Sequence, residues 1–92
     1  MPNFVTRIEL HDATWENYDD LHTRMEGYGF SRTIPGINGE RYTLPTATYY
    51  GESDTMTGRE VLELARQAAN ATGKANSVIT TQGDSNFYLY VA

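Results

Sequence analysis

The chain has 92 residues, no cysteine and a formal net charge of −5, which predicts a single domain over residues 1–92 with a small core. The lack of cysteine excludes disulfides, thiolate zinc sites and cysteine nucleophiles. The acidic balance argues against a protein that coats nucleic acid through charge alone, although six of the seven basic residues are Arg, whose forked guanidinium suits phosphate or carboxylate.

Residues 1–4 contain neither the basic nor the apolar region of a signal peptide. No apolar run approaches the roughly 20 residues that a membrane-spanning helix needs. With two histidines and no cysteine, the sequence offers no convincing metal site. We therefore expect a soluble, cytoplasmic protein that uses no membrane, no metal and no cofactor.

Residues 4–10 alternate between two faces, which predicts a half-buried strand. One face carries Phe4, Thr6, Ile8 and Leu10, and the other carries Val5, Arg7 and Glu9. A helix is expected next, because apolar residues recur at helical spacing. These residues are Trp15, Tyr18, Leu21, Met25 and Tyr28. Thr14 or Asp12 is placed to cap the helix, and Gly27 and Gly29 bracket its end.

Two strands, over residues 30–34 and 41–50, are expected to form a hairpin. The Asn38-Gly39 pair between them is a typical turn signal. Pro45 lies inside the second of these strands and cannot donate to a ladder. The second strand is therefore predicted to lie at an edge or to contain a bulge.

The rest of the chain predicts one more helix and two more strands. Thr57 and Glu60 match a capping box, and the helix is expected to end near Gly73. Strands are expected over residues 77–81 and 87–91, and the Gly-Asp pair in the loop between them indicates a closing hairpin.

The order of these elements is β-α-β-β-α-β with an extra C-terminal strand. This order predicts an α+β fold of the ferredoxin-like, split-βαβ type. We expect an antiparallel sheet with both helices on one face and the other face open.

The open face of such a sheet is the first place to look for function. Arg7 lies on this face of the first strand, and one register of the last strand exposes Tyr88 and Tyr90. Arginine and tyrosine side chains on an open sheet can bind phosphate and stack on RNA bases. The alternative is that these aromatic residues pack in a dimer interface or simply cover the sheet.

Three residues near the first helix are candidates for catalysis. Asp12 follows the first strand, where a carboxylate can act as a catalytic or metal ligand, but it could equally cap the helix. His22 is a competent general base near neutral pH, and Arg24 could steady a phosphate. The alternative is that His22 is a surface residue on the polar side of the helix.

Arg32 and Arg41 lie on the two strands of the predicted hairpin and can approach each other across it. Together they would suit an RNA phosphate or an acidic partner. The alternative is that each pairs with a nearby carboxylate, Glu26 or Glu40, in surface salt bridges that contribute little to stability.

Two short strings and the order of the elements resemble the GhoS family, the antitoxins of type V toxin–antitoxin systems. The strings are Met25-x-x-x-Gly29-Phe30-Ser31-Arg32-Thr33-Ile34 and Tyr42-x-Leu44-Pro45. This resemblance covers most of residues 4–91 and implies a small ferredoxin-like endoribonuclease that cleaves the messenger RNA of a membrane-acting toxin. It also implies a basic residue on the first helix, and His22 stands near that place with Arg24 two residues on.

The resemblance leads to an RNA-directed hypothesis. In it, Arg7, His22, Arg24 and Arg32 hold the phosphate backbone, and His22 transfers a proton to or from the ribose 2′-OH. The rival hypothesis is a non-enzymatic interaction module. Such a domain would dimerise through its sheet and bind a protein partner through its acidic helical surface.

Overall fold

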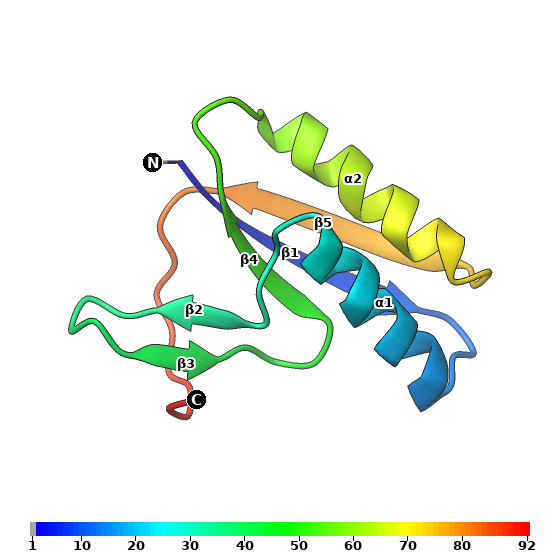
Figure 1. Ribbon diagram of the computed structural model, residues 1–92, viewed down its shortest axis with the longest axis horizontal. Helices are drawn as coiled ribbons and strands as arrows, with labels where there is room; N and C mark the ends of the chain where they lie inside the picture. The colour runs from blue at the N-terminus through cyan, green and yellow to red at the C-terminus, as the bar shows by residue number, and fades with distance from the viewer. Residues whose placement is uncertain (1) are drawn as a thin grey trace.

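The computed structural model describes residues 2–92 and contains two helices and five strands (Figure 1). The elements are β1 (Asn3–Leu10), α1 (Trp15–Gly27), β2 (Thr33–Pro35), β3 (Arg41–Thr43), β4 (Thr48–Glu52), α2 (Gly58–Ala71) and β5 (Asn76–Gln82). The strands form a three-stranded antiparallel sheet in the order β4-β1-β5 and a two-stranded antiparallel sheet of β2 and β3. The fold is therefore α+β, as the sequence predicts.

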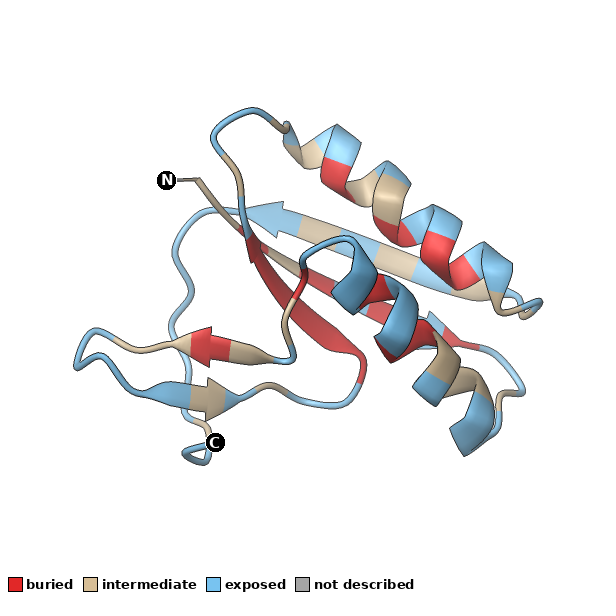
Figure 2. Ribbon diagram, viewed as in Figure 1, coloured by how far each residue is buried: buried red, intermediate tan, exposed pale blue. Residues whose placement is uncertain are grey.

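The central strand β1 separates a buried face from an exposed one, as its alternation predicts. Phe4, Thr6 and Ile8 are buried, whereas Arg7 and Glu9 are exposed (Figure 2). Both helices pack on the buried face, where Leu21 and Met25 of α1 and the alanines of α2 join one apolar cluster with β1. In the described part of the chain, no helix covers the opposite face of the sheet (Figure 1).

Each helix begins at the capping box that its sequence allows. In α1 the box joins Thr14 to Asn17, and in α2 it joins Thr57 to Glu60. Thr14, and not Asp12, is therefore the N-cap of α1. The prediction of a continuous apolar stripe on α1 is wrong at its start, because the side chain of Trp15 is 77% exposed.

The predicted strand over residues 30–34 is wrong in its bounds, since β2 covers only Thr33–Pro35. Phe30 still belongs to the C-terminal cap of helix α1, because its backbone N–H donates to the carbonyl of Met25 at 3.0 Å. Gly29 permits this closure with φ +91°. Ser31 then makes a single bridge to Tyr50, which joins this segment to the outer edge of β4.

The single long strand predicted over residues 41–50 is also wrong. It is split into β3 and β4 by a turn in which the N–H of Thr48 donates to the carbonyl of Pro45 at 3.1 Å. Ala47 adopts φ +58° in this turn. The physical reason is Pro45, which cannot donate to a ladder, so the chain leaves one sheet and enters the other. The hairpin is confirmed in its shorter form, as β2 and β3 pair around Gly39.

The extra C-terminal strand predicted over residues 87–91 is wrong as well. Only Val91 makes an isolated bridge, and its partner is Tyr42 of β3. The closing hairpin with β5 does not form, because Gly83 turns the chain at φ +128° after β5. The C-terminal segment then runs to the β2–β3 hairpin, where the N–H of Thr43 donates to the carbonyl of Tyr90.

Neither helix in the described part of the chain has the length and apolar character needed to cross a membrane.

Candidate functional site

Two groups of candidate residues lie on opposite faces of the three-stranded sheet. On the helix side, His22 of α1 is 6% exposed and its Nδ1 lies 2.6 Å from the hydroxyl of Tyr49 on β4. Tyr49 is fully buried, and the two rings lie at a tilt with centroids 5.8 Å apart. The alternative of His22 as a surface residue is therefore wrong, because this side chain joins the helix to the sheet.

The protonation of this pair follows from its burial. Burial lowers the pKa of His22, and the positive charge of Arg32 lowers it further, while burial raises the pKa of Tyr49. Both groups are thus neutral at pH 7, and the tyrosine hydroxyl keeps its proton. Nδ1 of His22 is the one hydrogen-bond partner of this hydroxyl among residues 2–92. The hydroxyl therefore donates to Nδ1, which leaves the imidazole proton on Nε2.

This tautomer decides what His22 can do. In its neutral form it presents an N–H donor at Nε2 and no free lone pair, so it suits hydrogen bonding to an anion better than removal of a proton. Arg32 is the cation whose positive charge lowers the pKa of His22, and no hydrogen bond joins the two side chains among residues 2–92. Of the predicted site residues, the structure joins His22 directly to Tyr49, whereas Arg32 acts on His22 through its charge.

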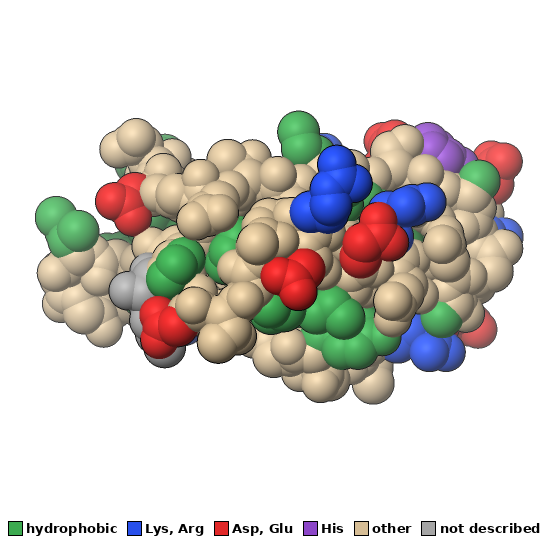
Figure 3. All heavy atoms as spheres, turned by 90° about the horizontal axis from the view of Figure 1, so that it is seen from above, with side chains coloured by type: hydrophobic (Ala, Val, Ile, Leu, Met, Phe, Trp, Pro, Cys, Tyr) green, Lys and Arg blue, Asp and Glu red, His purple; other side chains and the backbone are tan. Residues whose placement is uncertain are grey.

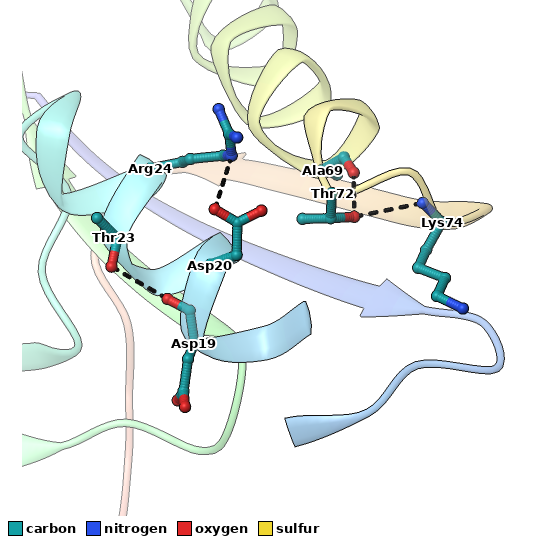
Figure 4. A network of polar contacts seen from close by, with 7 residues as sticks. All are labelled: Asp19, Asp20, Thr23, Arg24, Ala69, Thr72 and Lys74. Carbon is teal, nitrogen blue, oxygen red and sulfur yellow. Dashed lines mark hydrogen bonds and ion pairs between the residues drawn. The ribbon is translucent and has the colours of Figure 1, made fainter. Parts of the chain in front are cut away.

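Arg24 lies apart from His22 on helix α1. Its Nε donates to the carboxylate of Asp20 at 3.0 Å in an exposed i,i+4 ion pair (Figure 4). Residues two apart on a helix do not share a face, so Arg24 and His22 cannot hold the same phosphate from one side. Arg24 is accounted for by its ion pair with Asp20.

Asp12 stands in the exposed turn between β1 and α1, with φ +53°. Its neighbour His11 contacts Ser77 of β5 through Nε2 at 3.2 Å and Glu9 through Nδ1 at 3.8 Å. Within the described residues, Asp12 shares no hydrogen bond or ion pair with His22 or Arg24. The three predicted catalytic residues therefore do not form one constellation.

Arg7 lies on the open face of the sheet, in the middle of the central strand β1. Thr48 of β4 and Ile79 of β5 stand directly opposite it on either side. Arg7 is exposed, and its guanidinium has neither a hydrogen-bond partner nor an ion-pair partner among residues 2–92. It is thus the basic group that this face offers to a ligand.

An aromatic groove of about 1240 Å³ lies on the same side of the sheet as Arg7, at the Asn3 end of β1. Tyr50 places it there, because Tyr50 lines the groove and pairs with Val5, which shares a face with Arg7. The other aromatic residues of the groove are Tyr42, Phe87 and Tyr88. The rings of Tyr42 and Phe87 lie 5.4 Å apart, and Tyr88 is fully exposed to solvent.

Two carboxylates, those of Glu52 and Asp84, also line this groove. The hydroxyl of Tyr50 donates to Glu52, and burial followed by this bond raises the pKa of Tyr50 to about 12. Asp84 accepts a hydrogen bond from the amide of Asn3 at 3.0 Å. Tyr90 follows directly in the sequence on the last residue that lines the groove. Its side chain is 90% exposed, and its carbonyl accepts a hydrogen bond from β3.

Arg41 has a structural task in the hairpin. Its Nε donates to Thr33 Oγ1 at 2.8 Å, and its Nη2 donates to Thr33 O at 2.9 Å and to Ser31 Oγ at 3.2 Å. It stands opposite Pro35 and not opposite Arg32. Neither arginine forms an ion pair with Glu26 or Glu40 in the described residues, so that alternative is wrong.

Sequence reasoning missed Tyr49, Tyr50 and Tyr42 as members of these sites. The signal was present in the run Thr48-Tyr49-Tyr50, since neighbouring strand residues point to opposite faces and so supply one tyrosine to each side. The long-strand prediction concealed this, because it put the whole run in one hairpin. Among residues 2–92, no group of three or more His, Cys, Asp or Glu side chains is placed to hold a metal ion.

Comparisons of the chain with protein-family models, with curated proteins and with solved structures gave no match.

Proposed function

We propose that this chain is a GhoS-like cytoplasmic protein that binds single-stranded RNA, the messenger of a toxin in the family it resembles. The strand order supports this, because β5, β1 and β4 lie side by side and Ser31 bridges the next segment to β4. That is the neighbour order expected of a ferredoxin-like, split-βαβ domain.

The observation that carries the proposal is that Arg7 and the aromatic groove lie on the same open face of the sheet. Single-stranded RNA is bound by aromatic rings that stack on bases and by basic groups that contact the backbone. Tyr88 and Tyr42 supply the rings, and Arg7 supplies a guanidinium that has no protein partner among residues 2–92. Tyr90 extends the row of exposed aromatic side chains.

We place cleavage second to binding in this proposal. His22 and Arg32 lie on the helix side, and neutral His22 carries its proton on Nε2, the nitrogen that does not contact Tyr49. In that form it would hold a phosphate oxygen or the ribose 2′-OH as a donor. Arg32 would supply the charge for the same phosphate.

The binding half is tested by fluorescence anisotropy of a labelled single-stranded RNA with wild-type protein, Arg7→Ala, Tyr88→Ala and Arg24→Ala. Tyr88→Ala is expected to weaken RNA binding about 5- to 100-fold, because it removes one aromatic ring on which a base stacks. Arg7→Ala should weaken binding and reduce its dependence on salt, because one phosphate contact is lost. Arg24→Ala is the matched control and should bind as the wild type does, since Arg24 is paired with Asp20.

The cleavage half is tested by incubating the same RNA with wild-type protein and with His22→Gln, each with and without EDTA. Cleavage that is lost in His22→Gln supports the assignment. Cleavage that persists in His22→Gln contradicts the role of His22. In the anisotropy experiment, equal RNA binding by the wild type and its three variants contradicts the RNA site on the open face.

A second candidate function has its own support in the groove. Glu52 and Asp84 put negative charge beside the aromatic rings, and Ile37 in the hairpin is fully exposed at the groove's border. The surface seen from above shows Lys and Arg side chains mixed with Asp and Glu (Figure 3), so this surface is not basic overall. These features suit a protein partner with basic and apolar side chains. Absence of RNA binding even at low salt, together with binding of a Lys- and Leu-rich peptide that Tyr88→Ala weakens, would favour this function.

A further inference from the structure

Strand β5 has a free edge, and the register of the sheet shows which backbone groups lie along it. Among residues 2–92, β5 pairs with β1 alone, because the order of the sheet is β4-β1-β5 (Figure 1). The N–H of His11 donates to the carbonyl of Ala75 at 2.8 Å, and the N–H of Gly83 donates to that of Asn3 at 2.9 Å. Hydrogen-bonded pairs alternate along an antiparallel ladder. Residues 77, 79 and 81 therefore bond to β1, and residues 76, 78, 80 and 82 point their N–H and C=O groups outward.

The side chains of β5 leave this edge unprotected. Proteins usually block an exposed strand edge with charged residues, proline, a bulge or a covering segment. β5 reads Asn-Ser-Val-Ile-Thr-Thr-Gln, with no charge, no proline and an unbroken ladder to β1. No backbone segment among residues 2–92 bonds to its outer side. Such an edge is a ready template for another strand.

We propose that β5 pairs with β5 of a second copy of this chain, antiparallel and centred on Ile79. In this register Val78 meets Thr80 of the second copy and Asn76 meets Gln82. All four outward residues of each copy are then paired, which gives eight backbone hydrogen bonds across the twofold axis. The two sheets become one six-stranded antiparallel sheet.

Two features favour a second copy as the occupant of this edge. Ile79 is 65% exposed on the open face, and on the axis it contacts its own equivalent, an apolar pair in a non-hydrogen-bonded position where side chains lie closest. The strand carries no charge, so like strands meet without local repulsion. A charged edge would instead require a partner of opposite charge.

A hollow of about 540 Å³ beside this edge, on the helix side of the sheet, leaves room for side chains of the second strand. It is lined by Asn76 and Val78 of β5, by Leu62, Arg66 and Asn70 of α2, and by Lys74 and Ala75 between these two elements. Thr80 and Gln82 of the second copy point to this side in the proposed register, and the Gln82 amide meets the amides of Asn70 and Asn76. The pairing thus fills space that α2 leaves beside the strand.

The charge of the chain sets the salt dependence of this dimer. Each copy carries a formal net charge of −5, so the two copies repel each other and salt should screen this repulsion. Dimerisation is therefore expected to strengthen as salt rises. RNA binding through Arg7 weakens as salt rises, so failure of one proposal can be told from failure of the other.

The first test is sedimentation velocity of the wild-type chain from about 1 µM to about 1 mM, a range over which mass action reveals weak association. We expect the mass to rise from 10.3 kDa toward twice that value. Ile79→Lys should abolish this rise, because two lysines would stand opposite each other on the axis. Thr46→Lys makes the same change of charge in the exposed turn before β4, and it should dimerise as the wild type does.

Amide exchange measured by NMR on the wild type identifies the edge without any variant. The N–H groups of residues 77, 79 and 81 should be protected at every concentration. Those of residues 76, 78, 80 and 82 should exchange at least about tenfold more slowly in the concentrated sample than in the dilute one. A monomer throughout the range, or a dimer in which these four amides stay unprotected, would overturn the proposal.

Discussion

The two faces of the three-stranded sheet are built from the same strands but from opposite kinds of side chain. On the helix face, even the polar groups are enclosed and paired, as Thr6 bonds to Thr80 at 2.8 Å and His22 bonds to Tyr49. On the open face, Arg7 has no partner among residues 2–92 and Ile79 is largely exposed. Packing on the helix face therefore stabilises the fold, whereas the groups available to a ligand or a second copy lie on the open face.

The largest expected effect comes from comparing two isoleucines on neighbouring strands. Ile8 of β1 is 2% exposed on the helix face, and Ile79 of β5 is 65% exposed on the open face. Ile8→Ala should lower the free energy of unfolding by about 2–5 kcal/mol, because it removes packed atoms and leaves a cavity. Ile79→Ala should change it by no more than about 0.5 kcal/mol. Urea unfolding of dilute protein, followed by circular dichroism, measures both.

Dilution matters in this comparison because Ile79 stands on the axis of the proposed dimer. A loss of stability in Ile79→Ala that grows with protein concentration would agree with that dimer. A large loss at every concentration would contradict the division between a stabilising face and an available one.

The parts of the fold that the sequence predicts are those set by local patterns. The alternation of β1, both helices and the capping boxes at Thr14 and Thr57 depend on residues within a few positions of each other. The errors arise where a longer-range choice decides. A proline such as Pro45 can end a strand or cause a bulge within it. Here the strand ends, because the residues that follow pair with β1 as strand β4. Residues 87–91 have strand-forming side chains, but Gly83 directs them to β3.

The candidate site was predictable in its residue types and not in its assembly. Arg7 could be assigned to the open face, because alternation along one strand fixes its side. The contact between His22 and Tyr49 could not be predicted, because it joins residues 27 positions apart across the helix–sheet interface. The sequence near Arg41 does not show that this arginine, unlike Arg32, is held by hydrogen bonds within the hairpin. Its partners Ser31 and Thr33 are set by the register of the hairpin.

A second prediction tests the packing of the helix face at a glycine. A Cβ on Gly51 would lie 2.5 Å from Cδ1 and 2.6 Å from Cε1 of the Phe30 ring, which is too close for any real contact. Gly51→Ala should therefore lower the free energy of unfolding by about 1–3 kcal/mol as Phe30 is displaced. Gly27→Ala is the matched control, because a Cβ there meets nothing within 4 Å and Gly27 lies in helix α1.

The control should change stability in the opposite direction, since Ala is favoured over Gly in a helix by up to about 1 kcal/mol. Thermal unfolding of the two variants beside the wild type gives the comparison. Equal stability of Gly51→Ala and wild type would show that Phe30 does not pack against β4 as described.

The smallest expected effect is the pH dependence that His22 adds to the helix face. Burial and Arg32 hold the pKa of His22 below its ordinary value of 6.5. Below pH 6.5 the unfolded chain therefore binds a proton that the folded chain does not, so the free energy of unfolding falls on acidification until the folded pKa is reached. One proton contributes at most about 1.4 kcal/mol for each pH unit of this window.

The measurement is the urea midpoint of wild type, His22→Gln and His11→Gln between pH 7.5 and pH 5. His22→Gln removes the titrating group and should flatten the slope, while the glutamine amide can still accept a hydrogen bond from Tyr49. His11→Gln is the matched control, because it makes the same substitution at an exposed histidine that does not contact Tyr49. Parallel slopes for all three proteins would mean that His22 is as free to take up a proton in the folded state as in the unfolded one. The imidazole of His22 would then be as accessible to protons from solvent as the side chains of the open face are.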